Sequence, residues 1–267
     1  MIVFPSAKIN IGLNIVNKRA DGYHDLETVF YPIMIKDVLE VIEAKTLSFT
    51  SSGLAIQGEQ EGNICLKAYD LLSRDMKLPF VQIHLHKDIP IGAGLGGGSA
   101  DVAFFIKLMN EKFDLGLNRE RMEHYASLLG ADCAFFIQNE PVFASGKGDY
   151  FEEIGLDLTN YFIVLIMPDV HSGTSEAFKN IIPKPAIASL KELIKNAIPT
   201  WKDTIENDFE SGLVKKYPAI GVIKDSLYHC GAIYASMSGS GSSVYGIFAS
   251  PLKLPELEGN NRVFYGV

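Results

Sequence analysis

The chain has 267 residues, of which 47% are hydrophobic and 21% charged, and its formal net charge is −8. This composition is that of an ordinary globular protein, and the length allows one large core or two medium ones, with two domains slightly favoured. The acidic balance argues against a nucleic-acid partner, which needs basic fields, but it leaves room for a small anionic substrate held by local lysines.

Cysteine usage and hydropathy indicate the compartment. The three cysteines, Cys65, Cys133 and Cys230, are widely spaced and form no CxxC pair, so we expect a reducing environment with neither a disulfide framework nor a zinc site. The N-terminal residues lack the continuous apolar block of a signal peptide. The longest uncharged run, residues 226–252, is too rich in Gly and Ser to cross a membrane. The cytoplasm is therefore the expected location.

The first part of the chain is predicted to form a β-hairpin followed by short strands and a helix. Apolar runs at residues 8–16 and 26–35 flank a segment in which Asp21-Gly22 is a strong turn signal. Residues 37–44 and 47–51 have the pattern of further strands, and residues 63–76 have that of a helix.

A glycine-rich stretch, PIGAGLGGGSAD, occupies residues 90–101, and four of the six residues 92–97 are glycine. Residues 81–89 before it have the pattern of a strand. Residues 99–110 after it have that of a helix, with Ser99 as N-cap and with Val102, Phe105, Ile106 and Met109 at helical spacing. A loop that runs from a strand into a helix N-terminus presents free N–H groups and the positive end of the helix dipole, which suit phosphate. A flexible linker is less favoured, because apolar elements bracket the stretch.

Two familiar glycine motifs do not explain this loop. Gly92-x-Gly94-x-x-Gly97 matches the dinucleotide fingerprint formally, but no second strand ending in an acidic residue follows about 20 residues later. The P-loop and protein-kinase signatures are absent. An NAD-linked oxidoreductase and a non-catalytic nucleotide-binding module remain alternatives from other classes.

Lys8 and Asn10 are polar residues within an otherwise apolar predicted strand, and their spacing of two places them on one face. An unpaired lysine in a core costs several kcal/mol, so Lys8 lies either at an exposed edge or beside a carboxylate. Asp132, in GADCAFFI, is the candidate partner. By itself, Asp132 is as readily a turn or capping residue as a catalytic one.

The second half of the chain mixes strands and helices without regular alternation, which favours an α+β fold over a doubly wound sheet. We place a domain boundary near residue 155, which gives domains 1–155 and 156–267. A charged helix is predicted at 118–130, a buried strand at 161–168, a helix start within 172–181, helices at 188–198, 207–217 and 218–230, and two strands around a Gly-Ser loop within 232–250.

Three segments together resemble the GHMP kinase superfamily: PSAKINIGL near the start, PIGAGLGGGSAD in the middle and SGSGSSVYGIF near the end. RADGYHDLETVFYPI is similar to the signature of one branch, the 4-diphosphocytidyl-2-C-methyl-D-erythritol kinases. The order and spacing of these segments match over nearly the whole chain. The resemblance implies a two-domain α+β fold, with a left-handed βαβ unit in the N-terminal domain and a ferredoxin-like α/β plait in the C-terminal one.

The resemblance also implies a reaction and a set of site residues. The reaction is the ATP-dependent phosphorylation of the erythritol 2-hydroxyl of a cytidine-diphosphate sugar alcohol, in non-mevalonate isoprenoid biosynthesis. Lys8 and Asp132 match the catalytic pair. Mg²⁺ is held mostly by phosphates and water, so no protein ligand is assigned, and neither nucleic acid nor membrane is an expected partner. The same chemistry on mevalonate or homoserine is the nearest rival. The residues implied for ATP are Asn63, Lys87, Pro90, Ile91, Gly92, Ala93, Gly94, Leu95, Gly96, Gly97, Gly98, Ser99 and Ala100, and those for the substrate are Asn10, Tyr23, His24, Phe30 and Phe178.

Overall fold

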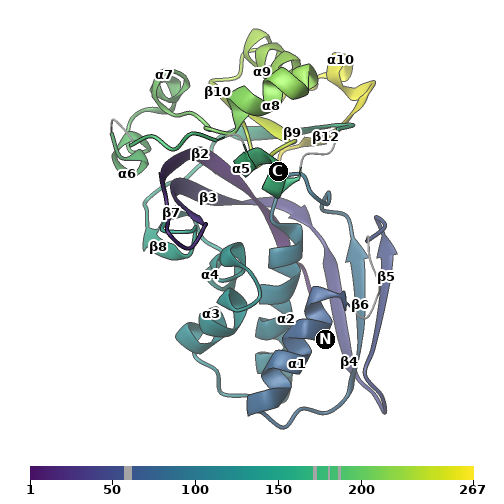
Figure 1. Ribbon diagram of the computed structural model, residues 1–267. Coiled ribbons are helices and arrows are strands. Elements are labelled where there is room, and N and C mark those ends of the chain that lie inside the picture. Colours follow the sequence, from purple (N-terminus) through teal and green to yellow (C-terminus); the bar gives the residue numbers. More distant parts are fainter. Residues whose placement is uncertain (57–61, 171–172, 180, 186–187) are drawn as a thin grey trace. The chain divides into compact units, whose positions relative to one another are not determined.

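The computed structural model describes residues 1–56, 62–170, 173–179, 181–185 and 188–267 (Figure 1). Strands and helices are mixed without regular alternation, as predicted for an α+β protein. In chain order they are β1 (Ile2–Val3), β2 (Ser6–Lys18), β3 (His24–Lys36), β4 (Val38–Glu43), β5 (Ser48–Gly53), α1 (Ile64–Asp75), β6 (Val81–Lys87), α2 (Gly97–Phe113), α3 (Arg119–Ser127), the 3₁₀ turn η2 (Ala131–Cys133), α4 (Phe135–Gln138), β7 (Val142–Ser145), β8 (Tyr150–Glu153), β9 (Phe162–Pro168), α5 (Thr174–Lys179), α6 (Leu190–Leu193), the 3₁₀ turn η3 (Ile198–Thr200), α7 (Trp201–Thr204), α8 (Glu210–Lys216), α9 (Pro218–His229), β10 (Tyr234–Met237), β11 (Val244–Phe248), α10 (Pro255–Glu258) and β12 (Asn261–Tyr265).

Packing divides the chain into two compact units, each built from several segments. The first unit consists of Met1–Ala7, Ile35–Ile91 and Gly96–Glu140, and the second of Lys8–Met34, Gly92–Leu95 and Pro141–Val267. The predicted boundary near residue 155 lies inside the second unit. The division into domains 1–155 and 156–267 therefore stays a prediction made from the sequence.

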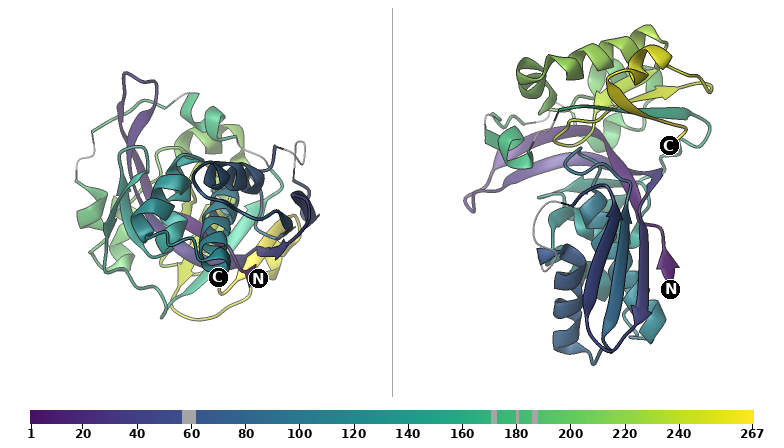
Figure 2. Two further views of the ribbon diagram at one scale, coloured as in Figure 1. Left: turned by 90° about the horizontal axis from the view of Figure 1, so that it is seen from below. Right: turned by 90° about the vertical axis from the view of Figure 1, so that its right-hand side faces the viewer.

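The first unit contains a four-stranded sheet in the order β1-β4-β6-β5. β6 pairs antiparallel with β4 and parallel with β5, and α1 lies in the crossover between β5 and β6. Along β6, Val81, Ile83 and Leu85 are buried, whereas Gln82 and His86 are exposed. This alternation is typical of a strand with one covered face, and α1 and α2 lie along that sheet in Figures 1 and 2.

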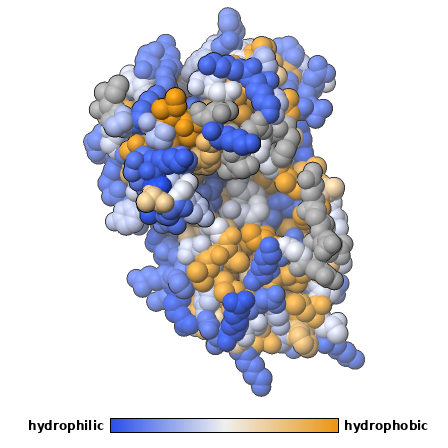
Figure 3. Space-filling view, viewed as in Figure 1, coloured by the Kyte–Doolittle hydropathy of each residue, from blue (hydrophilic) through white to orange (hydrophobic). Residues whose placement is uncertain are grey.

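Helix α2 supplies much of the core of the first unit. The residues predicted to share its buried face, Val102, Phe105, Ile106 and Met109, are all fully buried. The predicted helical spacing is therefore confirmed. Figure 3 shows hydrophilic residues over most of the visible surface and a group of hydrophobic residues over the helices of the first unit.

The second unit contains two four-stranded sheets, β2-β3-β7-β8 and β10-β11-β9-β12. The latter is antiparallel throughout, with helices in the chain between β9 and β10 and between β11 and β12. This is the order of a ferredoxin-like plait, as predicted. Its core includes Val164 and Ile166 of β9 together with Ile220 and Leu227 of α9.

Two features of the second unit differ from the prediction. The helix predicted over 188–198 is short, because α6 covers only Leu190–Leu193 and η3 begins at Ile198. Ala197 between them has a ψ of 134°, outside the helical range, so no single helix runs through this segment. Strands β7, β8 and β12 were not predicted; they are four or five residues long, and β7 and β12 pair with strands remote in sequence.

Tyr245 of β11 ties this plait to strand β2 within the second unit. Its hydroxyl donates to the Asn10 carbonyl oxygen at 3.0 Å, and its side chain is fully buried. Tyr245→Phe removes the donor, so we expect the free energy of unfolding to fall by about 1–2 kcal/mol. Chemical denaturation measures the change. Tyr150→Phe, at a side chain that is 64% exposed, is the control, and equal losses in both variants would contradict this role.

Candidate nucleotide and substrate site

The first half of the glycine loop, Gly92–Leu95, is held within the second unit by hydrogen bonds to its backbone carbonyls. The Ser238 hydroxyl donates to the Gly94 carbonyl at 2.9 Å, and the Lys8 N–H donates to the Leu95 carbonyl at 3.0 Å. Gly94 has a φ of +78°, and a Cβ there would lie 2.0 Å from the Ser238 carbonyl oxygen. Only glycine fits at this close approach.

The second half of the loop is the start of helix α2 in the first unit. Gly96, with a φ of +71°, is the N-cap, and no side chain caps the helix. The prediction of Ser99 as N-cap is therefore wrong: Ser99 lies inside the first turn, after two glycines that already have helical conformation. The first N–H groups of a helix have no partner within it, so this start can donate hydrogen bonds to an anion.

The other loop residues divide into anchors and an exposed part. Apolar side chains between the glycines point inward, and this orients the backbone of the loop. Buried positions are Pro90, Ala93, Leu95, Gly97 and Ala100, whereas Gly92, Gly98 and Ile91 are exposed, with Ile91 at 45%. A Cβ at Gly98 would meet no atom of the described residues within 4 Å, so the space above Gly98 is open.

Lys87 and Asn63 support the elements around the loop. Lys87 Nζ donates to the carboxylates of Asp37 and Asp101. The Asn63 side chain caps α1 by accepting a hydrogen bond from the Cys65 N–H at 2.8 Å. A direct contact of Lys87 or Asn63 with nucleotide stays a prediction.

Asp132 lies in η2, close to the helix start, within the first unit. It is half-buried. Its neighbour Cys133 is buried and its thiol interacts with the Ser99 hydroxyl; burial raises the pKa of this thiol to about 11, an effect that the Ser99 contact opposes. The segment that carries Asp132 is thereby attached to the first turn of α2.

Lys8, Asn10 and Phe30 form a buried group in the second unit. Lys8 is 3% exposed; its Nζ lies 2.5 Å from Asn10 Oδ1 and 4.7 Å from the centroid of the Phe30 ring. The same-face placement of Lys8 and Asn10 is confirmed, and Lys8 is not at an exposed edge. Asn10 Nδ2 in turn donates to the Thr28 hydroxyl at 2.9 Å. Lys8 and Asp132 belong to different units, so their pairing stays a prediction.

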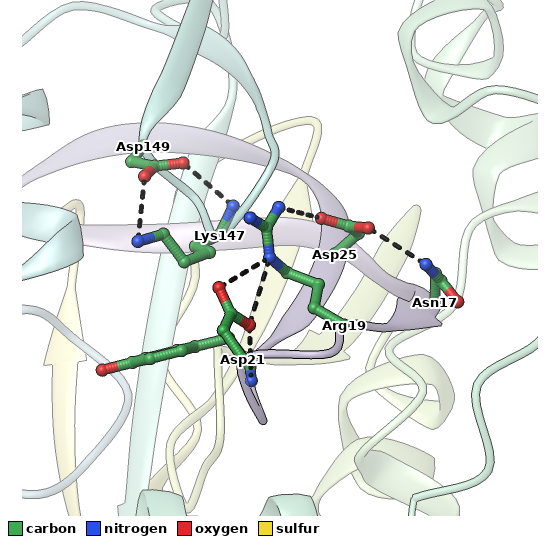
Figure 4. A network of polar contacts seen from close by, with 7 residues as sticks. Asn17, Arg19, Asp21, Asp25, Lys147 and Asp149 are labelled. Atoms are coloured by element: carbon green, nitrogen blue, oxygen red, sulfur yellow. Dashed lines mark hydrogen bonds and ion pairs between the residues drawn. The ribbon is translucent and has the colours of Figure 1, made fainter.

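The tip of the β2–β3 hairpin is held by a network of charges (Figure 4). Arg19 bridges Asp21 at 3.2 Å and Asp25 at 2.9 Å. A hydrogen bond from the Tyr23 N–H lowers the pKa of Asp21, and one from Arg19 lowers that of Asp25, so both contacts persist at neutral pH. Lys147 lies 5.1 Å from the centroid of the Tyr23 ring, which is 62% exposed.

Beside this tip the second unit has a row of aromatic rings. His24 stacks on Phe178 with centroids 5.0 Å apart, and Phe178 meets Phe209 edge-on at 4.8 Å. A pocket of about 350 Å³ adjoins the row, and its lining includes Phe209, Asn207 and Lys184. The structure thus brings Phe178 to the hairpin from more than 150 residues away in sequence, as the resemblance implies.

Three residues with structural importance for the loop were not among the predicted site residues. Ser238 was noted only as part of a Gly-Ser motif, and Asp37 and Asp101 were not singled out. Lys87 could have led to Asp37 and Asp101. Its place at the end of an alternating strand predicts that its side chain is buried, and a buried ammonium group requires carboxylate partners.

Sequence comparison supports the same family along both halves of the chain. Residues 63–140 match the model of the GHMP kinases N terminal domain, and residues 186–260 match that of the GHMP kinases C terminal domain. A 4-diphosphocytidyl-2-C-methyl-D-erythritol kinase of Bacteroides fragilis is 52% identical over 97% of this chain and 96% of its own length. The enzyme of the same name in Porphyromonas gingivalis is 40% identical over 93% and 92%.

Solved structures agree. A crystal structure of 4-(cytidine 5'-diphospho)-2C-methyl-D-erythritol kinase superposes with a TM-score of 0.80 at 25% identity, over 100% of this chain and 98% of the other. The mevalonate kinase of Methanococcus jannaschii, at 16% identity and a TM-score of 0.68 over 99% and 97%, shares the fold. On the extent and identity of these matches, the chain belongs to the 4-diphosphocytidyl-2-C-methyl-D-erythritol kinase family of GHMP kinases.

Proposed function

We propose that this protein transfers the γ-phosphoryl group of ATP to the erythritol 2-hydroxyl of 4-diphosphocytidyl-2-C-methyl-D-erythritol, in the non-mevalonate route to isoprenoid precursors. The observation that carries the proposal is the uncapped, glycine-lined start of α2 with Asp132 attached beside it. Such a helix start binds phosphate through backbone N–H groups. Family membership removes the NAD-linked alternative.

In this mechanism Asp132 accepts or orients the proton of the attacking hydroxyl. Lys8 orients the attacking hydroxyl and offsets charge on the transferred group. A weak base is sufficient, because phosphoryl transfer has a loose transition state in which positioning and charge stabilisation do most of the catalysis. A non-catalytic binding module would need neither residue.

In our proposal Mg²⁺ binds largely through the nucleotide. Among the described residues no group of three or more His, Cys, Asp or Glu side chains could hold a metal ion. Magnesium commonly keeps several waters and binds through substrate phosphates, so no such group is required. When bound there, it supplies charge neutralisation at the β- and γ-phosphates.

The cytidine group is assigned to the hairpin tip and the aromatic row. In our proposal the base stacks between Tyr23 and Phe178, and His24 bonds its edge, with Phe30 and Asn10 on the side of the reacting alcohol. Aromatic rings stack on any base, and an imidazole can donate or accept a hydrogen bond. Mevalonate and homoserine have no base to stack, so these residues favour the cytidine substrate over the substrates of those two rivals.

The setting proposed for this reaction is the cytoplasm. In the part of the chain that the structure describes, no helix has both the length and the apolar character needed to cross a membrane.

Gly98→Ala tests the phosphate loop. The new methyl group meets no described protein atom, so the stability of the protein should not change. A phosphate bound above Gly98 would be displaced, however, and ATP affinity should fall about 10-fold or more, which corresponds to the loss of one charge-assisted hydrogen bond. Titration calorimetry with a non-hydrolysable ATP analogue measures it. Gly155→Ala, also open, is the control. Unchanged ATP affinity in Gly98→Ala would show that the phosphates do not bind above Gly98.

Asp132→Asn tests the chemistry. The substitution keeps the size of the side chain but removes the base, so turnover should fall by about 10²-fold or more, while the ATP analogue still binds. Initial rates at saturating substrates give the result. Asp70→Asn removes the same charge from an exposed position of α1 and should leave turnover unchanged. Near-normal turnover in Asp132→Asn would make Asp132 a structural turn residue.

Tyr23→Ala tests the substrate assignment. Stacking of an aromatic side chain on a base is worth about 1–3 kcal/mol, so affinity for the cytidine substrate should fall roughly 5- to 150-fold with little change for ATP. His24→Ala should also reduce discrimination against the uridine analogue. Initial rates with both substrates measure these effects, with Tyr161→Ala as control. Equal use of both bases by the wild type would contradict the cytidine assignment and leave the protein assigned only as a small-molecule kinase.

A further inference from the structure

Lys87, Asp37 and Asp101 form a buried cluster in the first unit. Lys87 Nζ donates to Oδ2 of Asp37 and, at 2.8 Å, to Oδ2 of Asp101. The three residues are exposed by only 3%, 0% and 2%. They come from the end of β6, from the link between β3 and β4, and from the second turn of α2, so the cluster joins three elements.

The cluster contacts the chain on both sides of the glycine loop, at the residues that lead into it and at the start of α2. Asp37 Oδ1 accepts hydrogen bonds from the N–H groups of Asp88 at 2.6 Å and Ile89 at 2.9 Å, which lead into the loop. At the helix start, a Cβ on Gly97 would lie 3.2 Å from Lys87 Nζ. The ammonium group therefore lies directly beneath the first turn of α2.

Two carboxylates and one ammonium leave a net charge of −1 in a site without water contact. A buried net charge is unfavourable, and two adjacent carboxyls hold on to a proton. Oδ1 of Asp101 has no hydrogen-bond partner among the described residues, and the Asp37 carboxyl lies within hydrogen-bonding reach of Asp101. Burial raises the pKa of Asp101 to about 8; Lys87 opposes this shift and Asp37 adds to it.

The other groups that face the cluster do not titrate in the same range. Burial lowers the pKa of Lys87, but Asp101 and Asp37 outweigh it and the pKa is raised overall, so Lys87 stays a cation. Cys65, on α1, also faces the cluster, and burial raises the pKa of its thiol well above the ordinary value. The proton on Asp101 is thus the one that changes near neutral pH.

We propose that Asp37, Lys87 and Asp101 act as a positioning cluster for the glycine loop and that Asp101 holds a proton there, so that the charge beneath the bound nucleotide phosphates is zero while the proton is held and −1 after it leaves. This inference rests on the proposed function, in which the start of α2 binds ATP. Loss of the proton places a negative charge under an anion site and weakens ATP binding at alkaline pH. In the proposed function the cytidine group binds at the hairpin tip of the second unit, so the KM for the sugar alcohol should depend less on the cluster than the KM for ATP.

The test is the affinity for a non-hydrolysable ATP analogue between pH 6.5 and 9.5, measured by calorimetry on the full chain. Wild-type affinity should fall about 3- to 15-fold as pH rises through about 8, as expected for one charge acting over about 10 Å at an effective dielectric near 20 with partial salt screening. Asp101→Asn keeps an acceptor for Lys87 but cannot ionise, so its affinity should stay level. Under turnover, the KM for ATP should carry a larger pH effect than the KM for the alcohol.

Glu111→Gln is the matched control, because it removes the same charge from an exposed position at the far end of the same helix; it should keep the wild-type pH dependence of ATP affinity.

The stability of the protein should depend on pH as well. The folded state binds more protons than the unfolded state between the ordinary carboxyl pKa of 3.8 and about 8, so the free energy of unfolding should fall as pH rises across that window in the wild type and not in Asp101→Asn.

A second measurement needs no variant. In wild-type protein labelled with ¹³C at aspartate carboxyls, one signal should titrate with a midpoint near 8. The proposal is overturned if no aspartate titrates above about pH 6, or if Asp101→Asn keeps the pH-dependent ATP affinity. If the wild type binds no ATP analogue at any pH, the proposed function itself fails, and this inference fails with it.

Discussion

The start of helix α2 depends on one buried ammonium group. Lys87 has no access to water and can be buried only if carboxylates surround it. Its partners, Asp37 and Asp101, lie 50 and 14 residues away in sequence, so burial of Lys87 requires that β6, the β3–β4 link and α2 come together. Asp37 also accepts hydrogen bonds from the backbone N–H groups that lead into the glycine loop. One set of charges therefore determines where the loop leaves the sheet and where its helix begins.

The other half of the loop depends on a close approach of backbones. Ser238 donates to the Gly94 carbonyl, and the position of the Ser238 carbonyl leaves no room for a side chain at residue 94. Glycine is thus required at Gly94 by the protein itself. At Gly98 no described protein atom requires it, which is the pattern expected where a ligand approaches the backbone. The glycines of one loop have different reasons for being glycine.

Substrate choice is separable from this phosphate-binding framework. Structures of kinases named for mevalonate and homoserine share the fold at 15–20% identity, with TM-scores of 0.68 for one mevalonate kinase and 0.61 for one homoserine kinase. A common fold with different named substrates implies that side chains decide what is phosphorylated. In our proposal the choice is made at the hairpin tip, where Arg19 bridges Asp21 and Asp25 and where His24 stacks on Phe178.

The sequence by itself determined the local features. The hairpin around Asp21-Gly22, the buried face of α2, the strand–loop–helix setting of the glycines and the placement of Lys8 and Asn10 on one face all follow from turn residues and side-chain periods that act over a few residues. The tertiary structure alone decided that Gly96 and not Ser99 caps α2, that the predicted helix over 188–198 is broken, and that Asp37 and Asp101 neutralise Lys87. The sequence predicts that a buried charge needs a partner of opposite charge. Which residue becomes that partner depends on how distant segments pack, and no local sequence pattern predicts it.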